Sequence, residues 1–170
     1  SMSGQAIALS GDQDDAVTNK GMIAGSVDLG AGDDTLNIYT NSTITGAMSA
    51  GEDDDTVNLL GTGTGALGVT TGFENLVVQS GTWGVADSQN YDHVVIKDGA
   101  TVTSHSSDTL KLRALSRDGS DTTVIEEGGK LTGTPAIRNT ETSVALDNAG
   151  TIDKITYGQA INLFLGEEDS

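Results

Sequence analysis

Pairs of aspartates recur in two neighbouring stretches and are the residues best suited to chemistry. Asp33 and Asp34 lie within residues 30–37, and Asp54 and Asp55 follow them 21 residues later. Carboxylates are preferred Ca²⁺ ligands, and the ion takes roughly six to eight oxygens. The GAGDDTLN stretch at 30–37 also fits the calcium-binding nonapeptide of β-roll toxins from its second Gly onward. Stacked Asp pairs are therefore a candidate calcium site.

The spacing favours a different interpretation of these aspartates. β-Roll motifs recur roughly every nine residues, not every 21, and Asp53 stands where the next copy of the motif needs a Gly. Stacked carboxylates about 5 Å apart repel one another, so water, backbone amides or a bound cation must relieve the repulsion. We expect a solvated acidic corner and assign no metal, cofactor-binding or catalytic residue. Calcium binding at Asp33, Asp34, Asp54 and Asp55 stays an open alternative.

Other residues give weaker signals for chemistry. His93 and His105 are twelve positions apart without a Cys partner, which is a poor metal-ligand pattern, and we expect His93 on an outer strand face. The sequence has no Gly-x-Ser-x-Gly phrase to supply an activated serine. Polysaccharide-cleaving β-helices need paired carboxylates, which this chain could supply, but aromatic residues are sparse. We therefore expect no enzyme, with polysaccharide binding or cleavage as a further alternative.

The element that positions the aspartates is a repeat. Residues 21–38 and 42–59 are two copies of one unit. Self-similarity near 20 residues is typical of solenoids, in which each unit buries its apolar side only by stacking on its neighbours. Strand-like alternation in both copies predicts an all-β chain with almost no helix. We expect a parallel β-helix of about seven coils over residues 1–170.

One apolar position can be followed along the whole chain. We expect it to form an inward column from these residues: Val17, Ile38, Leu59, Val78, Ile96, Ile125 and Leu146. A second apolar residue follows about six positions later, as Ile23, Ile44, Trp83, Val102, Leu131 and Ile152, with Gly65 in its place once. Gly81, Gly99 and Gly128 fall between the two positions and predict tight corners.

Two features depart from the regular repeat. The longest step, between Ile96 and Ile125, predicts an inserted loop or hairpin at 104–121. GQAIAL at 4–9 returns as GQAINL at 158–163, which indicates a segment cut from a longer repeat array. An uncovered terminal coil exposes unpaired strand groups, so we expect the isolated segment to self-associate end to end.

Charge limits the partners. The chain has 25 acidic and 8 basic residues, for a net charge of −17, which excludes nucleic acid and anionic lipid as partners because both would be repelled. We expect any anionic partner to bind near the basic residues Lys111, Arg113 and Arg117. No apolar run approaches the roughly 18 residues of a membrane span, so we expect no membrane insertion of this segment.

Several phrases resemble those of a known family. GFENLVVQSGTW at 72–83, NAGTI at 148–152 and the G-x-G-D-D-T-L of 30–36 are similar to phrases in the passenger domains of bacterial autotransporters, which use type V secretion. The resemblance implies a right-handed parallel β-helix, export through the outer membrane, and display at the bacterial cell surface. Such adhesin-like passengers often serve adhesion, aggregation and virulence.

From the repeat and the resemblance together we expect a non-catalytic structural stalk or adhesin. Its partners would be host or neighbouring-cell surface molecules, either protein or glycan.

Overall fold

The computed structural model describes residues 4–85, 91–104, 121–132, 137–139, 144–153 and 161–163. Within these ranges every element is a strand and no helix occurs, as the alternating sequence predicted. None of these ranges contains a helix that could cross a membrane. All strand pairs are parallel, as in β4 (Ser26–Asp28) on β1 (Gln5–Ala8). The all-β solenoid prediction is therefore confirmed.

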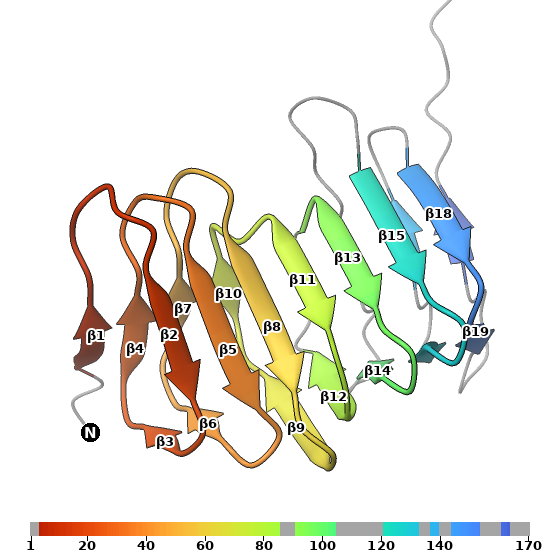
Figure 1. Cartoon of the computed structure of the whole chain (residues 1–170), viewed down its shortest axis with the longest axis horizontal. Helices are drawn as coiled ribbons and strands as arrows, with labels where there is room; N and C mark the ends of the chain where they lie inside the picture. The colour runs from red at the N-terminus through yellow and green to blue at the C-terminus, as the bar shows by residue number, and fades with distance from the viewer. Residues whose placement is uncertain are drawn as a thin grey trace, which may run out of the picture.

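The strands form three main walls of a coil (Figure 1). The first wall contains β1, β4, β7 (Met48–Ser49) and β10 (Thr70–Thr71). The central wall contains β2 (Ala16–Asn19), β5 (Thr35–Tyr39), β8 (Thr56–Leu60), β11 (Asn75–Val78), β13 (His93–Ile96), β15 (Asp121–Ile125) and β18 (Val144–Asn148). The third wall contains β9 (Thr64–Leu67), β12 (Thr82–Val85), β14 (Thr101–Ser104), β16 (Lys130–Thr132) and β19 (Thr151–Asp153).

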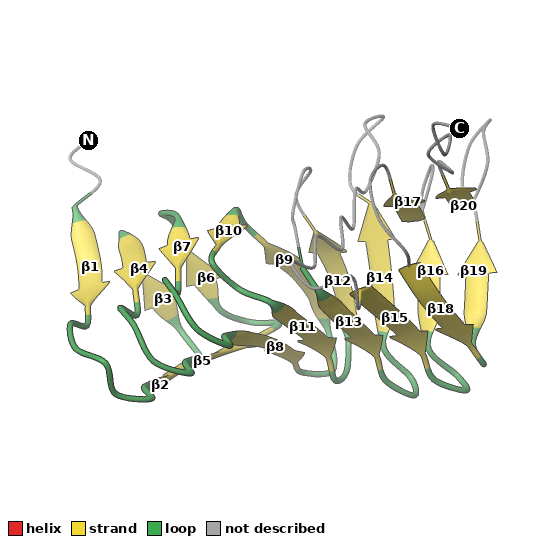
Figure 2. Cartoon of the chain, turned by 90° about the horizontal axis from the view of Figure 1, so that it is seen from above, coloured by secondary structure: helices red, strands yellow, loops and turns green. Residues whose placement is uncertain are grey.

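Two short pairs complete the coil: β3 (Met22–Ile23) with β6 (Thr43–Ile44), and β17 (Ile137–Asn139) with β20 (Ile161–Leu163). Along the stack the chain runs up the first wall and down the central wall in front of it, which makes a right-handed parallel β-helix (Figures 1 and 2). The sequence predicted about seven coils. Among the described residues seven strands do stack in the central wall, but the first wall has four and the third five, so complete turns number about five.

Two buried columns run through the central wall. The predicted column is confirmed from Ile38 to Ile125, because register pairs its five members in sequence: Ile38, Leu59, Val78, Ile96 and Ile125. All five are at most 3% exposed. Burying each such side chain fully stabilises the fold by about 1.5–3 kcal/mol.

The predicted ends of that column are wrong. Val17 pairs with Leu36 and Leu146 pairs with Thr123, so both belong to the neighbouring column. Asn19 takes the end position next to Ile38. It is buried at 4% exposure, but its side chain donates to the Thr43 carbonyl oxygen at 3.2 Å and accepts the Gly21 N–H at 3.1 Å. A polar residue can occupy the column because these bonds satisfy it.

The third wall holds the second predicted column. Register pairs Gly65 with Trp83 and Trp83 with Val102, so the Trp ring points inward and is 0% exposed. The Trp83 indole N–H donates to the Ser80 carbonyl oxygen at 2.9 Å. A Cβ on Gly65 would lie only 2.5 Å from Cζ3 of that ring. Gly65 therefore leaves the space that the ring of the next coil fills.

Tight corners join the central and third walls where glycines were predicted. Gly81, Gly99 and Gly128 have φ values of 85°, 73° and 84°, in the left-handed region that favours glycine. The predicted insertion at 104–121 lies outside the described residues, apart from the strand ends Ser104 and Asp121. His105, Lys111, Arg113 and Arg117 also lie outside them.

Candidate functional site: the carboxylate corner

The aspartate pairs lie at the corner between the first and central walls, which we call the carboxylate corner. Strand β5 begins at Thr35, β8 at Thr56 and β11 at Asn75, and these first residues pair with one another. The residue just before each of the first five central strands is acidic, giving one column along the stack: Asp15, Asp34, Asp55, Glu74 and Asp92. The repeat thus brings acids from successive coils together.

The column members are linked by backbone hydrogen bonds. The Asp15 N–H donates to Asp34 Oδ1 at 2.7 Å, and the Asp34 N–H donates to Asp55 Oδ1 at 2.7 Å. The Asp55 N–H donates to Glu74 Oε2 at 2.9 Å. Each carboxylate thus reaches back to the preceding coil. These contacts are short and link each coil to the next, so they hold successive coils in register.

These bonds form an inner ladder of carboxylates. A second, outer ladder consists of exposed carboxylates, each of which accepts an N–H from the following coil instead of the preceding one. The Asp33 N–H donates to Asp14 Oδ1 at 3.1 Å, and the Asp54 N–H donates to Asp33 Oδ1 at 3.1 Å. These three side chains are exposed, whereas Asp34 and Asp55 are 1% and 0% exposed. The predicted stacking is therefore confirmed for both pairs. The expectation that both pairs are solvated is wrong for the inner one, because Asp34 and Asp55 continue the inward alternation of their strands.

Asp53 adopts the backbone of the glycine that it replaces. Its φ is 90°, and Gly32 on the preceding coil has a φ of 116°. The Asp53 side chain also accepts the Gly32 N–H through Oδ2 at 3.3 Å. The substitution therefore preserves the shape of the turn, contrary to the sequence interpretation. It leaves a non-glycine residue in a conformation that costs about 1–3 kcal/mol.

The inner carboxyl groups are short of partners. Asp34 Oδ2 and Asp55 Oδ2 are buried and accept no hydrogen bond. Burial raises the pKa of Asp55 from 3.8 to about 6; the Asp34 N–H opposes this, and the charges of Glu74, Asp34 and Asp33 add to it. Burial also raises the pKa of Glu74, and the charges of Asp92 and Asp54 contribute. The corner therefore favours the neutral form of Asp55.

The described carboxylates of the corner are not gathered around a shared centre. Among the described residues, no group of three or more His, Cys, Asp or Glu side chains is arranged to hold a metal ion. The two ladders explain this, because each carboxylate points along the stack toward a backbone amide rather than toward a shared centre.

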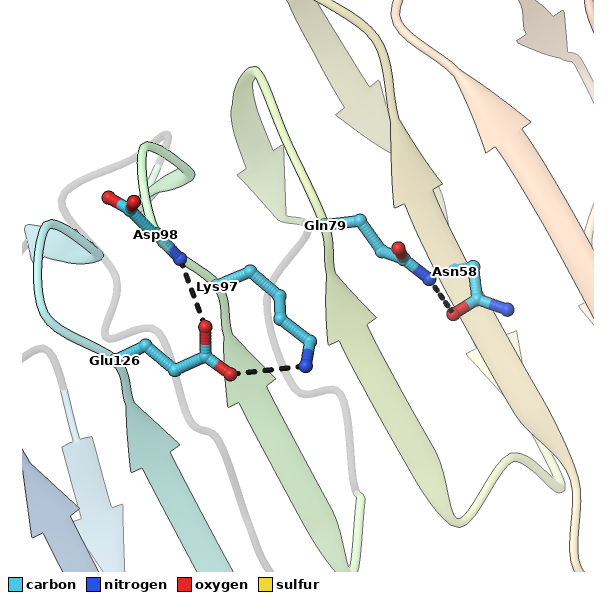
Figure 3. Close-up of polar contacts among 5 residues, drawn as sticks. All are labelled: Asn58, Gln79, Lys97, Asp98 and Glu126. Atoms are coloured by element: carbon cyan, nitrogen blue, oxygen red, sulfur yellow. Dashed lines mark hydrogen bonds and ion pairs between the residues drawn. The ribbon is translucent and has the colours of Figure 1, made fainter.

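Of the remaining sequence candidates, His93 lies on the outer face of the central wall. His93 faces outward as predicted and contacts Thr122 Oγ1 through Nδ1 at 2.7 Å. Figure 3 shows two neighbouring contacts on this face: Gln79 donating to Asn58 at 3.1 Å, and Lys97 paired with Glu126 at 3.1 Å. The hydrogen bond from Lys97 lowers the pKa of Glu126. These contacts tie rungs together and leave His93 with a structural partner.

Sequence reasoning missed Asp15 and Glu74 as members of the inner ladder. Glu74 lies in the GFENL phrase, where the turn before the strand is shorter than in the preceding coil. The available signal was position, because an acid directly precedes each of five successive central strands: Asp15, Asp34, Asp55, Glu74 and Asp92.

The chain was also compared with known proteins. No protein-family model, no curated protein and no solved structure matches it.

Proposed function

We propose that this chain is a non-catalytic segment of a bacterial autotransporter-like passenger, displayed at the cell surface as a stalk or adhesive spacer. The observation that carries the proposal is the central wall, in which seven parallel strands stack in register from β2 to β18 (Figure 1). Because each rung contacts only its neighbours, such a stack makes a rod. A rod holds binding surface away from the cell that carries it. The GFENL and SGTW phrases at 72–83 support the secretion route.

The outer face of the central wall supports a role in adhesion. Asn37 donates to Thr18 at 3.3 Å, Asn58 donates to Asn37 at 3.1 Å, and Gln79 donates to Asn58 at 3.1 Å. Side chains already ordered by one another lose little further entropy when a partner binds. The proposed partners are surface proteins or glycans of a host or neighbouring cell.

Bead adhesion tests the adhesive role. Beads coated with the chain are expected to bind target cells or one another more than beads coated with the Ile38→Asp variant, whose core cannot form. Equal binding by both coatings would contradict adhesion through the folded surface. Antibody labelling of intact cells of the source organism tests display. Labelling that requires permeabilised cells would contradict it.

A calcium-binding module is the second candidate, favoured by the partnerless Oδ2 atoms of Asp34 and Asp55. Calorimetry of calcium into the chelator-stripped protein separates it from a stalk. An ion that binds only the folded state must raise the melting temperature by mass action. A melting temperature unchanged by millimolar calcium would eliminate this candidate. Release of reducing ends from polysaccharides would instead favour the enzyme alternative.

A further inference from the structure

The two buried carboxyl groups of the carboxylate corner use their oxygens unequally. Asp55 Oδ1 accepts the Asp34 N–H at 2.7 Å, whereas Asp55 Oδ2 is buried without a partner. Asp34 repeats the arrangement with the Asp15 N–H at 2.7 Å. An ionised carboxylate has acceptor sites on both oxygens, whereas the neutral acid uses one oxygen as acceptor and carries hydrogen on the other. A partnerless buried oxygen costs more free energy in an ionised carboxylate than in a neutral acid, so this geometry favours the acid form of Asp55.

The groups that face this position add negative charge. Glu74 lies on the following rung, Asp34 on the preceding rung, and Asp33 beside it. Glu74 in turn faces Asp92 and Asp54. The other acids in the turns of the corner are Asp12, Asp14, Asp15, Glu52 and Asp53.

Tyr91 lies next to the corner, and its hydroxyl contacts Thr70 Oγ1 at 2.7 Å. Burial raises the pKa of Tyr91, so its side chain stays neutral. Like charges and burial both disfavour ionisation of Asp55.

We propose that Asp55 is a proton-binding site that couples the stability of the stack to pH: the folded chain holds a proton on Oδ2 that the unfolded chain releases. Burial, which raises the pKa of Asp55 to about 6, places this proton within the mildly acidic range. Because the folded pKa lies above the unfolded value, the stabilisation is fully present below pH 3.8 and is lost as pH rises through about 6. The stack is thus more stable in mildly acidic surroundings than at neutral pH.

Urea unfolding at a series of pH values tests the proposal on three proteins: the wild type, Asp55→Asn and Asp54→Asn. For the wild type we expect the unfolding equilibrium constant to rise about 100-fold as pH passes from below 4 to above 6. Asp55→Asn keeps an acceptor for the Asp34 N–H but cannot titrate, so most of this rise should disappear. Asp54→Asn removes the same charge from an exposed neighbour and should retain the rise.

Two outcomes of that experiment would overturn the proposal. The first is a wild-type pH dependence in Asp55→Asn. The second is an equal loss in Asp54→Asn, because it would assign the effect to general charge repulsion along the corner.

Infrared spectroscopy of the wild type keeps the test independent of whether Asp55→Asn folds. A buried protonated carboxyl should be seen at pH 5 and disappear by pH 8, and its absence at pH 5 would refute the assignment. Unfolding at pH 8 with and without millimolar calcium tests the rival ligand. No effect of calcium supports the proton. A stabilisation by calcium that Asp55→Asn abolishes would make the ligand a cation and overturn the proposal.

Discussion

Replacing Gly65 with Ala tests the packing of the third wall most directly. The added Cβ would lie 2.5 Å from Cζ3 and 2.8 Å from Cε3 of Trp83. Carbon atoms in favourable contact are about 3.5–4.0 Å apart, so the overlap is roughly 1 Å. Overpacking of this kind costs about 1–3 kcal/mol. Replacing a strand glycine with Ala otherwise stabilises by about 0.5–1 kcal/mol, so we expect a net loss of about 1–2 kcal/mol.

The measurement is thermal and urea unfolding followed by circular dichroism. For a chain of this size the loss corresponds to a melting temperature lower by roughly 2–8 °C. Gly63→Ala is the matched control, because its Cβ would lie 3.7 Å from Thr40 Oγ1, an ordinary contact. We expect the control to be as stable as the wild type or more stable.

A double-mutant cycle isolates the ring as the cause. In a Trp83→Leu background the side chain opposite Gly65 is smaller, so Gly65→Ala should become neutral or stabilising. The reasoning is refuted if Gly65→Ala behaves like Gly63→Ala. It is also refuted if Gly65→Ala costs the same with and without the Trp ring.

Three further predictions concern the inward face of the central wall, the Asp53 turn of the carboxylate corner, and the terminal strands. Ile38→Asp should unfold the chain, because it buries an unpaired charge, whereas Asn37→Asp on the outer face should cost about 1 kcal/mol or less; equal damage in urea unfolding would show that the inward face is misassigned. Asp53→Gly should raise the free energy of unfolding by up to about 1 kcal/mol by removing a strained φ, and a clear loss would show that the bond from the Gly32 N–H matters more. Light scattering should show the apparent mass rising with salt, because β1 pairs only with β4 among the described strands and screening weakens the repulsion between acidic ends. A mass independent of salt would contradict end-to-end association.

The apolar spacing was enough to predict most of the core. Ile38 through Ile125 recur at one inward position of β5, β8, β11, β13 and β15, and Trp83 falls opposite Gly65 in the register. The ends of the column could not be found in this way. Asn19, which is buried, and Asn148, which is exposed, occupy those positions, and an apolar pattern cannot detect a polar residue at the end of a column. The nearest apolar residues, Val17 and Leu146, lie two positions away and belong to the neighbouring column.

The carboxylate corner was only partly predictable. Stacking follows from the repeat, and the burial of Asp34 could have been inferred because it lies two residues before the inward Leu36. The direction in which each carboxylate reaches could not have been inferred from the sequence, because it depends on which neighbouring backbone amide lacks a strand partner. The backbone of Asp53 was also beyond sequence reasoning, since residue preference does not favour its φ of 90°.

The turns at the carboxylate corner differ in length from coil to coil, and this bears on how such a chain can change. Residues 50–55 separate β7 from β8, whereas only residues 72–74 separate β10 from β11. The acid before the strand nevertheless keeps its place in the ladder, since Asp55 still meets Glu74. Insertions and deletions in these turns are thus absorbed within a single coil. Because every rung bonds only to the rungs beside it, duplication of one unit of about 20 residues lengthens the rod without redesign of the rest.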